Sequence, residues 1–383
     1  MKTINKNVVM LGWASYFTDM ASAMVTPILP IFVVTVLHEG MDKLGIIVAA
    51  ATFVSYALRI LSGYIADRYG IVKPLVITGY ALSCISKPLI GLTHGYKSVA
   101  LIRSIERLGK GIRSSPKDMM IAHYSQKNSS GKTFGFHKTL DIAGELSGTL
   151  LLFGLLYYFG QSEAVMRTIF YATLIPGVIG LLIVIYFVKD ISRPLSGEKK
   201  LSFKLTQNDI SSIKSLIFYF MFILFALNDA FFTMQAKEVG IATLVIPLLF
   251  IVSTATQTFT SYYFGVLIDR MGVKKIMLFA YISGVVSQIL LYLQSPVYTW
   301  VSYGFLGLFT VASLNANRAN IAKNADNKGV VFGVFYAGVA LFGAIGAYVS
   351  GMIWEHFGMD TALEFSLFFT ILVTLLFLLR RKY

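Results

Sequence analysis

The sequence contains two related stretches, GYIADRYGIVKP at 63–74 and GVLIDRMGVKKI at 265–276. Each begins with glycine, carries an Asp-Arg pair and continues with a second glycine and then lysine. Each directly follows a long apolar run, and the two lie about half a chain length apart. This spacing predicts a chain of two homologous halves that share one structural plan.

Two further correspondences support the repeat. Asp19 in the first apolar run matches Asp229 in the seventh. An Ile-Ala pair at 121–122 and another at 321–322 are each followed by a Phe-Gly pair. An internal repeat of six apolar runs is typical of a transporter whose binding site lies between its two halves.

The composition is that of a membrane protein. Hydrophobic residues make up 56% of the 383 residues and charged residues only 14%, whereas soluble domains carry about 25% charged residues. This excludes most soluble enzymes, nucleic-acid binders and secreted disulfide scaffolds. Cys84 is the single cysteine, which excludes an internal disulfide and a cysteine zinc site. We interpret the net charge of +14 as contact with anionic lipid headgroups.

The apolar runs predict an all-α integral membrane protein rather than a barrel, because they are long and continuous instead of alternating. A helix needs about 20 residues to cross the hydrocarbon core of a bilayer. The predicted fold is two six-helix bundles related by pseudo-symmetry. Its twelve spans are expected at 8–36, 43–66, 74–94, 97–121, 133–159, 165–188, 215–236, 240–268, 274–294, 297–321, 329–353 and 359–380.

Lysine and arginine cluster in alternate loops and at both ends of the chain. This predicts that these loops and both termini face the cytoplasm, in a multi-pass protein of the bacterial inner membrane. The segment 189–214 breaks the apolar pattern, because it is polar and basic and contains Pro194 and Gly197. We therefore expect an N-terminal six-helix bundle at 1–188, a cytoplasmic linker at 189–214 and a C-terminal six-helix bundle at 215–383.

With its predicted spans and its repeated loop, the chain resembles the major facilitator superfamily over its whole length. The loop signature of that family, G-x-x-x-D-R-x-G-x-[RK]-[RK], is matched in the second half. The first half matches it except that Ile71 and Val72 stand where the family usually has basic residues. The resemblance implies transport by alternating access, in which this loop helps to lock one conformation. The expected lock residues are Gly63, Asp67, Arg68, Gly70 and Arg113 in the first half, and Gly265, Asp269, Arg270 and Gly272 in the second.

Two signatures of proton-coupled members of the family are matched only in part. The fourth-span signature has glutamine where this chain has Lys110. The fifth-span antiporter signature fits at Gly135, Gly144 and Gly148, but it has proline where this chain has Thr149. These departures leave the direction of transport open. The strings YFTDMASAM, ERLGKGIRSSPKD and FGFHKTLDIAG look like a bacterial branch of the superfamily.

Ionisable residues inside the predicted spans are candidates for function, since each costs at least ~2.5–3.5 kcal/mol at bilayer depth. They are concentrated in the first half, where basic residues outnumber the acids if those acids are partly protonated. An arginine fork fits a carboxylate or a phosphate, so we expect an anionic or zwitterionic organic solute. The expected substrate-binding residues are Arg59, Arg103, Glu106, Arg107, Lys110, Lys138, Asp229 and Asn315.

Asp141 and Glu145 lie one helical turn apart on the fifth span. Two acids so placed repel each other, and low-dielectric surroundings favour the protonated form of at least one. We therefore expect proton coupling through Glu145 or Asp141, and next through Asp19. A structural alternative stays open for the single charges, because Glu106 and Lys110 at the i,i+4 spacing would neutralise each other.

The expected function is secondary active transport driven by the proton gradient, not enzymatic catalysis. The expected partners are a small-molecule substrate, protons and membrane lipid, with no nucleic acid, no cofactor and no metal, and we expect a monomer. Alternatives are an exporter of drugs or metabolites, an importer of siderophores, and a lipid flippase. A sensor or scaffold is disfavoured, because it has no use for charges inside the membrane.

Overall fold

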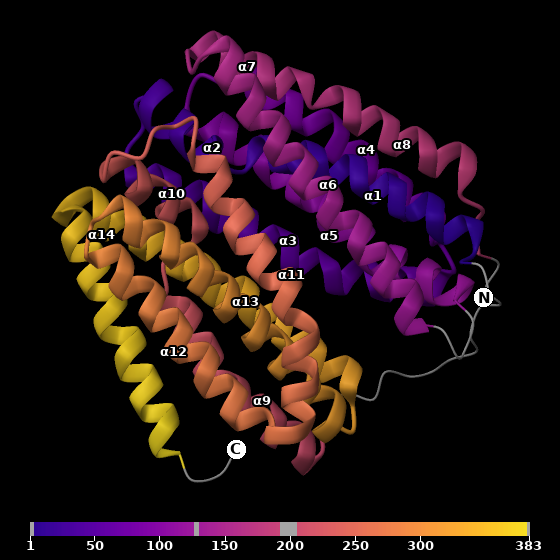
Figure 1. Ribbon diagram of the computed structural model, residues 1–383. Helices are drawn as coiled ribbons and strands as arrows, with labels where there is room; N and C mark the ends of the chain where they lie inside the picture. The colour runs from indigo at the N-terminus through magenta and orange to yellow at the C-terminus, as the bar shows by residue number, and fades with distance from the viewer. Residues whose placement is uncertain (1–3, 126–129, 192–204, 381–383) are drawn as a thin grey trace. The chain divides into compact units, whose positions relative to one another are not determined.

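The computed structural model describes residues 4–125, 130–191 and 205–380, without the side chains of residues 60, 67, 130–132 and 328. Every regular element in these ranges is a helix, and none of them contains a strand (Figure 1). The all-α fold class predicted from the apolar runs is therefore confirmed. Half of the predicted linker, residues 192–204, lies outside the described residues.

The first half begins with a broken helix. α1 (Lys6–Val25) ends before Pro27, which has no backbone N–H to continue a helix. The chain then forms the short α2 (Leu29–Ile31) and a π-helical turn, η1 (Phe32–Val36). The other elements of this half are α3 (Met41–Tyr69), α4 (Lys73–Leu89), η2 (Ile90–Leu92), α5 (Tyr96–Tyr124), α6 (Ser130–Phe159), α7 (Glu163–Ala172) and α8 (Leu174–Phe187).

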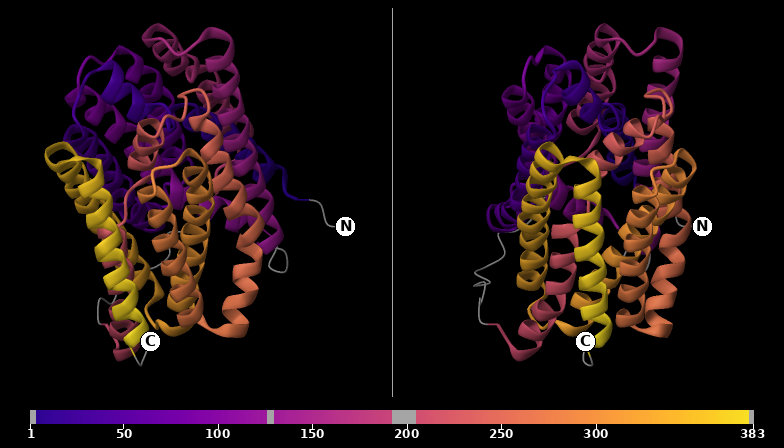
Figure 2. Two further views of the ribbon diagram at one scale, coloured as in Figure 1. Left: turned by 60° about the vertical axis from the view of Figure 1, so that its left-hand side comes forward. Right: turned by 90° about the vertical axis from the view of Figure 1, so that its left-hand side faces the viewer.

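The second half begins with a capping box, in which Thr206 and Asp209 each accept a hydrogen bond from the other's backbone N–H. Its last element, α14 (Lys328–Leu379), is two helices joined by a sharp turn at Gly358. The φ of Gly358 is 90°, a conformation that favours glycine, and Figure 2 shows the yellow chain reversing its direction within α14. The other elements are α9 (Gln207–Phe225), α10 (Asp229–Glu238), α11 (Ile246–Met271), α12 (Val273–Tyr292) and α13 (Pro296–Asn324).

In the described ranges, nine helical segments are long and apolar enough to cross a membrane. The difference from the twelve predicted spans arises at three places. α5 carries many charged residues, and α11 contains the polar run STATQTFTSYY at 253–263. The predicted spans 329–353 and 359–380 form one continuous segment across Gly358. The number twelve therefore stays a prediction.

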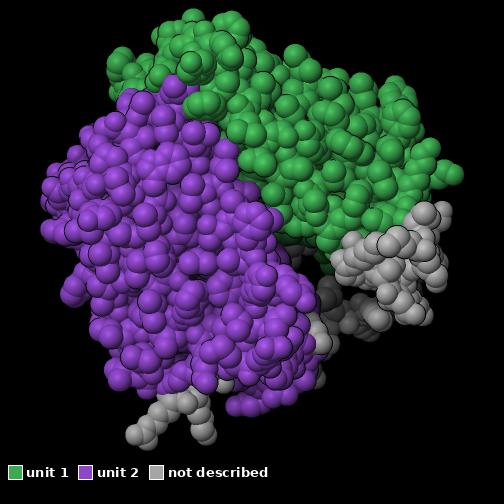
Figure 3. Space-filling view, in the orientation of Figure 1, with its two compact units in different colours: residues 1–39, 50–200 green, residues 40–49, 201–383 purple. Residues whose placement is uncertain are grey.

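The chain divides into two compact units, which Figure 3 colours separately. Unit 1 contains residues 1–39 and 50–200, and unit 2 contains residues 40–49 and 201–383. The first turns of α3 thus belong to unit 2, although the rest of that helix belongs to unit 1. Each unit has its own buried apolar core.

In unit 1, α1 packs mainly against α6 and α8, and α4 packs mainly against α5. A Cβ atom on Gly144 or Gly148 of α6 would lie only 2.2 Å from the backbone oxygen of Tyr16 or Met20, respectively. Small residues in membrane helices allow backbones to approach this closely. Two glycines of the fifth-span pattern therefore support the packing of α6 against α1.

In unit 2, α12 and α11 pack against α13, and α9 packs against α14. The core is rich in aromatic rings, and the ring centroid of Phe222 lies 4.9 Å from that of Tyr281 and 4.8 Å from that of Phe309. The start of α3 is attached by a 2.6 Å hydrogen bond from the backbone N–H of Met41 to the Glu355 carboxylate. This bond satisfies one of the backbone donors left over at a helix N-terminus.

We expect Gly148→Ala to lower the apparent Tm of the detergent-solubilised protein by about 5 °C or more, because the added methyl group collides with backbone rather than with a movable side chain. Gly154→Ala on the same helix is the control, since nothing lies within 4 Å of its Cβ position. Fluorescence-detected size-exclusion chromatography after heating measures both. An unchanged Tm for Gly148→Ala would contradict the close approach of α1 and α6.

Candidate functional site

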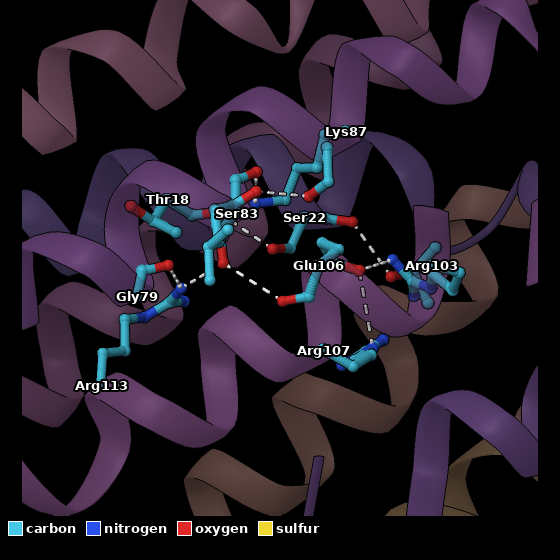
Figure 4. A network of polar contacts seen from close by, with 12 residues as sticks. Thr18, Ser22, Gly79, Ser83, Lys87, Arg103, Glu106, Arg107 and Arg113 are labelled. Atoms are coloured by element: carbon cyan, nitrogen blue, oxygen red, sulfur yellow. Dashed lines mark hydrogen bonds and ion pairs between the residues drawn. The ribbon is translucent and has the colours of Figure 1, made fainter. Parts of the chain in front are cut away.

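Buried charge in unit 1 is concentrated where α4 meets α5 (Figure 4). Lys87 of α4 and Arg103, Glu106 and Arg113 of α5 are each at most 5% exposed. In the described part of unit 2, by contrast, Asp209 is the only charged side chain buried to this degree. We define the α4–α5 charge cluster as Lys87, Arg103, Glu106, Arg107 and Arg113.

Glu106 is the acidic centre of this cluster. Its carboxylate forms an ion pair with Arg103 and lies 3.7 Å from Nε of Arg107. Arg103 precedes Glu106 by three residues, a spacing that places both on one face of α5. Lys110, the partner considered for Glu106 from the sequence, is exposed.

Lys87 is the most deeply buried cation, with only 1% of its surface exposed. Its Nζ donates one hydrogen bond, of 3.3 Å, to the backbone oxygen of Ser83. An ammonium group has three donors, and within the described residues no second hydrogen-bond acceptor is found for this one. The sequence patterns did not point to Lys87, although it is the only Lys, Arg, Asp or Glu in the predicted span 74–94 and that isolation was a usable signal.

Arg113 connects α5 to α4. Its guanidinium donates a 2.5 Å hydrogen bond to Oγ of Ser83 and lies 4.7 Å from the ring centroid of Tyr80. The two helices come close here because neither Gly79 nor Gly109 has a side chain, and a Cβ atom on Gly79 would lie 2.5 Å from the Gly109 oxygen. The sequence predicts Arg113 as a lock residue, and the structure places it in the buried contact between α4 and α5.

Positive charge exceeds negative charge in the cluster, which contains four cations and one carboxylate. A further acid, Asp19 of α1, acts electrostatically on Lys87 and on Lys110. Charges in low-dielectric surroundings are stable only when they are paired, so an excess of cations favours an anionic ligand. Arginine forks and ammonium groups are the side-chain groups that bind carboxylate and phosphate. The arrangement is therefore suited to hold an anion or the anionic end of a zwitterion.

A second polar cluster joins α1, α4, α5 and α6. Oγ of Ser15 accepts a 2.8 Å hydrogen bond from Lys117 and lies 3.0 Å from the hydroxyl of Tyr80. The same oxygen lies 3.3 Å from Nε2 of His137, whose Nδ1 is 3.4 Å from a carboxylate oxygen of Asp141. We define these five residues as the Ser15 cluster. Asp141 is the only one of them predicted as a site residue from the sequence.

The other two expected proton carriers, Glu145 and Asp19, are half-buried. Glu145 lies one turn beyond Asp141 on α6. Asp19 acts electrostatically on Lys117 of the Ser15 cluster. Lys138, next to the buried His137 in sequence, is exposed.

The remaining expected substrate-binding residues lie elsewhere. Arg59 of α3 approaches Asp118 of α5 at 3.7 Å, and both side chains are partly exposed. In unit 2, the amide of Asn315 on α13 donates a 3.2 Å hydrogen bond to the backbone oxygen of Ser261 on α11. Asp229 is the exposed first residue of α10.

The first lock loop is built by glycines at its two ends. A Cβ atom on Gly63 would lie 3.2 Å from that of Ser115, so glycine keeps α3 close to α5. Gly70 follows α3 with a φ of 67°, which favours glycine. Arg68 is exposed and donates to the hydroxyl of Tyr64, and the side chain of Asp67 lies outside the described ones.

The second lock loop, where α11 meets α12, shares only the turn glycine of the first. Gly272 ends α11 with a φ of 85°, again a conformation for glycine. Gly265 has no atom within 4 Å of its Cβ position, so no close contact is found there within the described residues. Asp269 and Arg270 are both exposed.

A family model described as Major Facilitator Superfamily matches residues 11–236 and 215–383. The chain belongs to the Major Facilitator Superfamily. It is a multi-pass membrane transporter, and the resemblance drawn from its repeated loops is confirmed.

Relatives of this transporter support its membership. An uncharacterized MFS-type transporter of Methanocaldococcus jannaschii is 28% identical over 370 residues, which cover 92% of this chain and 90% of that protein. The multidrug resistance protein MdtH of Escherichia coli is 26% identical over 134 residues, which cover 35% of this chain and 33% of MdtH. A crystal structure of a mutant of the nucleoside transporter NupG matches with a TM-score of 0.81 at 14% identity, covering 98% of this chain and 100% of that chain. At this low identity the structural match shows the shared fold alone.

We expect Glu106→Gln to destabilise the transporter, because it leaves Arg103 and Arg107 without their buried counter-charge. Breaking a buried ion pair costs about 3–5 kcal/mol. Glu163→Gln is the control, since it breaks the exposed pair with Arg167 on α7, and exposed pairs contribute about 1 kcal/mol or less. Thermal unfolding in detergent compares the two, and equal losses of Tm would show that the buried pair is not important for stability.

Proposed function

We propose that this protein is a secondary active transporter, driven by the proton gradient, that moves a small anionic or zwitterionic organic solute across the bacterial inner membrane by alternating access. The observation that carries the proposal is the excess of cations in the α4–α5 charge cluster (Figure 4). Membership in the superfamily supports transport of a small molecule, and the charge of the cluster supports its chemical class.

Two members of the cluster are the best candidates for direct contact with the solute. Lys87 has two ammonium donors beyond its single hydrogen bond to Ser83. Arg107 is the most exposed of the cluster arginines, and at 3.7 Å it is held more loosely by Glu106 than Arg103 is. The exposed Lys110 would add positive charge beside them. The further predicted contacts are Arg59, Lys138, Asp229 and Asn315.

Proton coupling is assigned to the carboxylates of α6 and α1. Asp141 is supported by its position beside the buried His137. Glu145 and Asp19 are half-buried acids of the same unit and stay candidates. Carboxylates at this depth are rare unless they serve a function.

The lock loops are proposed to stabilise one state of the alternating-access cycle. Gly63 and Gly70 support this in the first half, since they set the close approach and the turn of the loop. Gly272 provides the corresponding turn in the second half. Asp67, Arg68 and Arg113, with Gly265, Asp269 and Arg270, complete the proposed lock.

We place the transporter in the inner membrane with both termini in the cytoplasm, because lysine and arginine cluster at the termini and in alternate loops. It would act as a monomer surrounded by lipid, without covalent chemistry, cofactor or nucleic acid. The proposed N-terminal and C-terminal bundles are residues 1–188 and 215–383, joined by the linker 189–214.

An exporter is the second candidate for the direction of transport. The 134-residue match to MdtH, which is named as a multidrug resistance protein, favours it. Gly144 and Gly148 of the fifth-span antiporter spacing, which lie at the close contact of α6 with α1, also favour it. Import and export would use the same anion site and the same proton gradient, and they differ in whether the proton moves with the solute or against it.

We expect Lys87→Gln to reduce transport of the solute at least about tenfold, because the substitution removes a charged hydrogen-bond donor. The measurement uses proteoliposomes with a one-unit inward proton gradient. A uniformly ¹³C-labelled bacterial metabolite extract is added outside, and mass spectrometry identifies what accumulates inside. Lys97→Gln, at an exposed lysine near the start of α5, is the matched control.

Accumulation of an acidic or zwitterionic metabolite by the wild type and by Lys97→Gln, but not by Lys87→Gln, would support the proposal. Uptake of a cationic or neutral metabolite, or equal uptake by all three proteins, would refute the anion site. The same assay with an outward gradient and the extract still outside distinguishes the two directions, because only a proton antiporter, the exporter, then accumulates the metabolite inside.

A further inference from the structure

Tyr80 links the two polar clusters of unit 1. Its hydroxyl lies 3.0 Å from Oγ of Ser15, and its ring lies 4.7 Å from the guanidinium carbon of Arg113. Arg113 donates to Oγ of Ser83 at 2.5 Å, and Ser83 donates to the backbone oxygen of Glu106 at 3.3 Å (Figure 4). The Ser15 cluster and the α4–α5 charge cluster therefore form one continuous series of contacts.

When His137 is neutral, each hydrogen bond of Ser15 can be assigned a donor and an acceptor. A serine hydroxyl donates one hydrogen bond and accepts two, and lysine only donates. Ser15 accepts from Lys117, so of Tyr80 and His137 one donates to Ser15 and the other accepts from it. If the neutral ring of His137 carries its proton on Nδ1, toward Asp141, then Ser15 donates to Nε2 and Tyr80 donates to Ser15. Each of the two hydroxyl donors then has an acceptor.

Protonation of His137 reverses this pattern. Both ring nitrogens then donate, so Ser15 accepts from His137 as well as from Lys117. The hydroxyl proton of Ser15 must then point to Tyr80, which changes from donor to acceptor. The ring of Tyr80 carries Arg113 on its face, so the change reaches the contact between α5 and α4.

Charged residues on the neighbouring helices determine the net charge around His137. α6 packs against α1, α5 and α7, and α7 begins beyond the opposite end of α6 at Glu163. Lys117 and Asp141 offset each other electrostatically, so a proton on His137 adds a net positive charge to the cluster. The titratable and charged groups of α1, α4, α5 and α6 at this end are Tyr16, Asp19, Tyr80, Arg113, Lys117, Asp118, Lys138, Asp141 and Glu145.

We propose that His137 is the positioning residue through which proton binding is coupled to the anion site. A proton on its ring turns the hydroxyl of Ser15 toward Tyr80 and thereby alters how Arg113 holds α5 against α4. A carboxylate oxygen of Asp141 lies 3.4 Å from Nδ1 of the ring, and imidazole is the side chain that changes charge near neutral pH. This inference deepens the proposed function and rests on it.

The test compares His137→Gln with His123→Gln in the proteoliposomes described above, again with the ¹³C-labelled extract. Glutamine forms hydrogen bonds but does not titrate, and His123 is an exposed residue near the end of α5. Two quantities are measured for the same metabolite: accumulation driven by a one-unit proton gradient, and exchange between equal internal and external concentrations without a gradient. Such a gradient supports up to about tenfold accumulation per proton.

We expect His137→Gln to lower the accumulation ratio to about one while exchange stays within about threefold of the wild type and no longer varies with pH. His123→Gln should behave like the wild type in both assays. Ser15→Ala retains His137 but removes the hydroxyl whose hydrogen bond changes direction, so this variant should also lose accumulation. It tests the inference if His137→Gln does not fold.

Wild-type accumulation by His137→Gln would overturn the inference and leave the proposed function intact. Equal loss of exchange and accumulation in folded His137→Gln would also overturn it, because that result indicates a general structural role. Absence of any transport by the wild type would overturn the proposed function itself, so the two failures are distinguishable.

Discussion

The ion pair between Glu106 and the arginines one turn before and one residue after it is the interaction on which the organisation of unit 1 depends. A charged group in low-dielectric surroundings costs several kcal/mol unless it is paired. α5 is accordingly too charged to be recognised as a membrane span by composition, and it fits into unit 1 because its charges meet partners on its own face and on α4. With Lys87 of α4 included, the α4–α5 charge cluster contains more cations than carboxylates. This excess of positive charge favours an anionic solute.

Close packing of helices makes these contacts possible. Gly79 and Gly109 bring α4 and α5 near enough for Arg113 to reach backbone and side-chain acceptors on α4. Gly144 and Gly148 bring α6 against α1, where the histidine and serine of the Ser15 cluster meet. The same small residues that stabilise unit 1 therefore set the distance between a titratable cluster and a cationic one. A transporter needs such a connection if proton movement is to drive solute movement.

The fold was largely predictable, because apolar runs of bilayer length and a repeated Gly-Asp-Arg-Gly loop leave few alternatives to paired helical bundles. The break after α1 and the joining of two predicted spans at Gly358 depend on local backbone geometry that hydropathy does not contain. In the site, Arg103 and Glu106 were found by residue type, since charge in a span is rare. Lys87 is less conspicuous, because it is a single charge in its span and the fourth and fifth spans each contain several. The contacts of Tyr80 with two clusters arise from how three helices pack, which spacing along one helix cannot reveal.

The central claim is that an anion binds at the buried cations of unit 1. The most direct measurement is native mass spectrometry of the purified transporter after incubation with the labelled metabolite extract, for the wild type and for Lys87→Met. We expect a small acidic or zwitterionic molecule bound to the wild type and lost from the variant, with phospholipid retained equally by both. A bound molecule without a negative group, or equal retention of the acidic molecule by Lys87→Met, would contradict the claim.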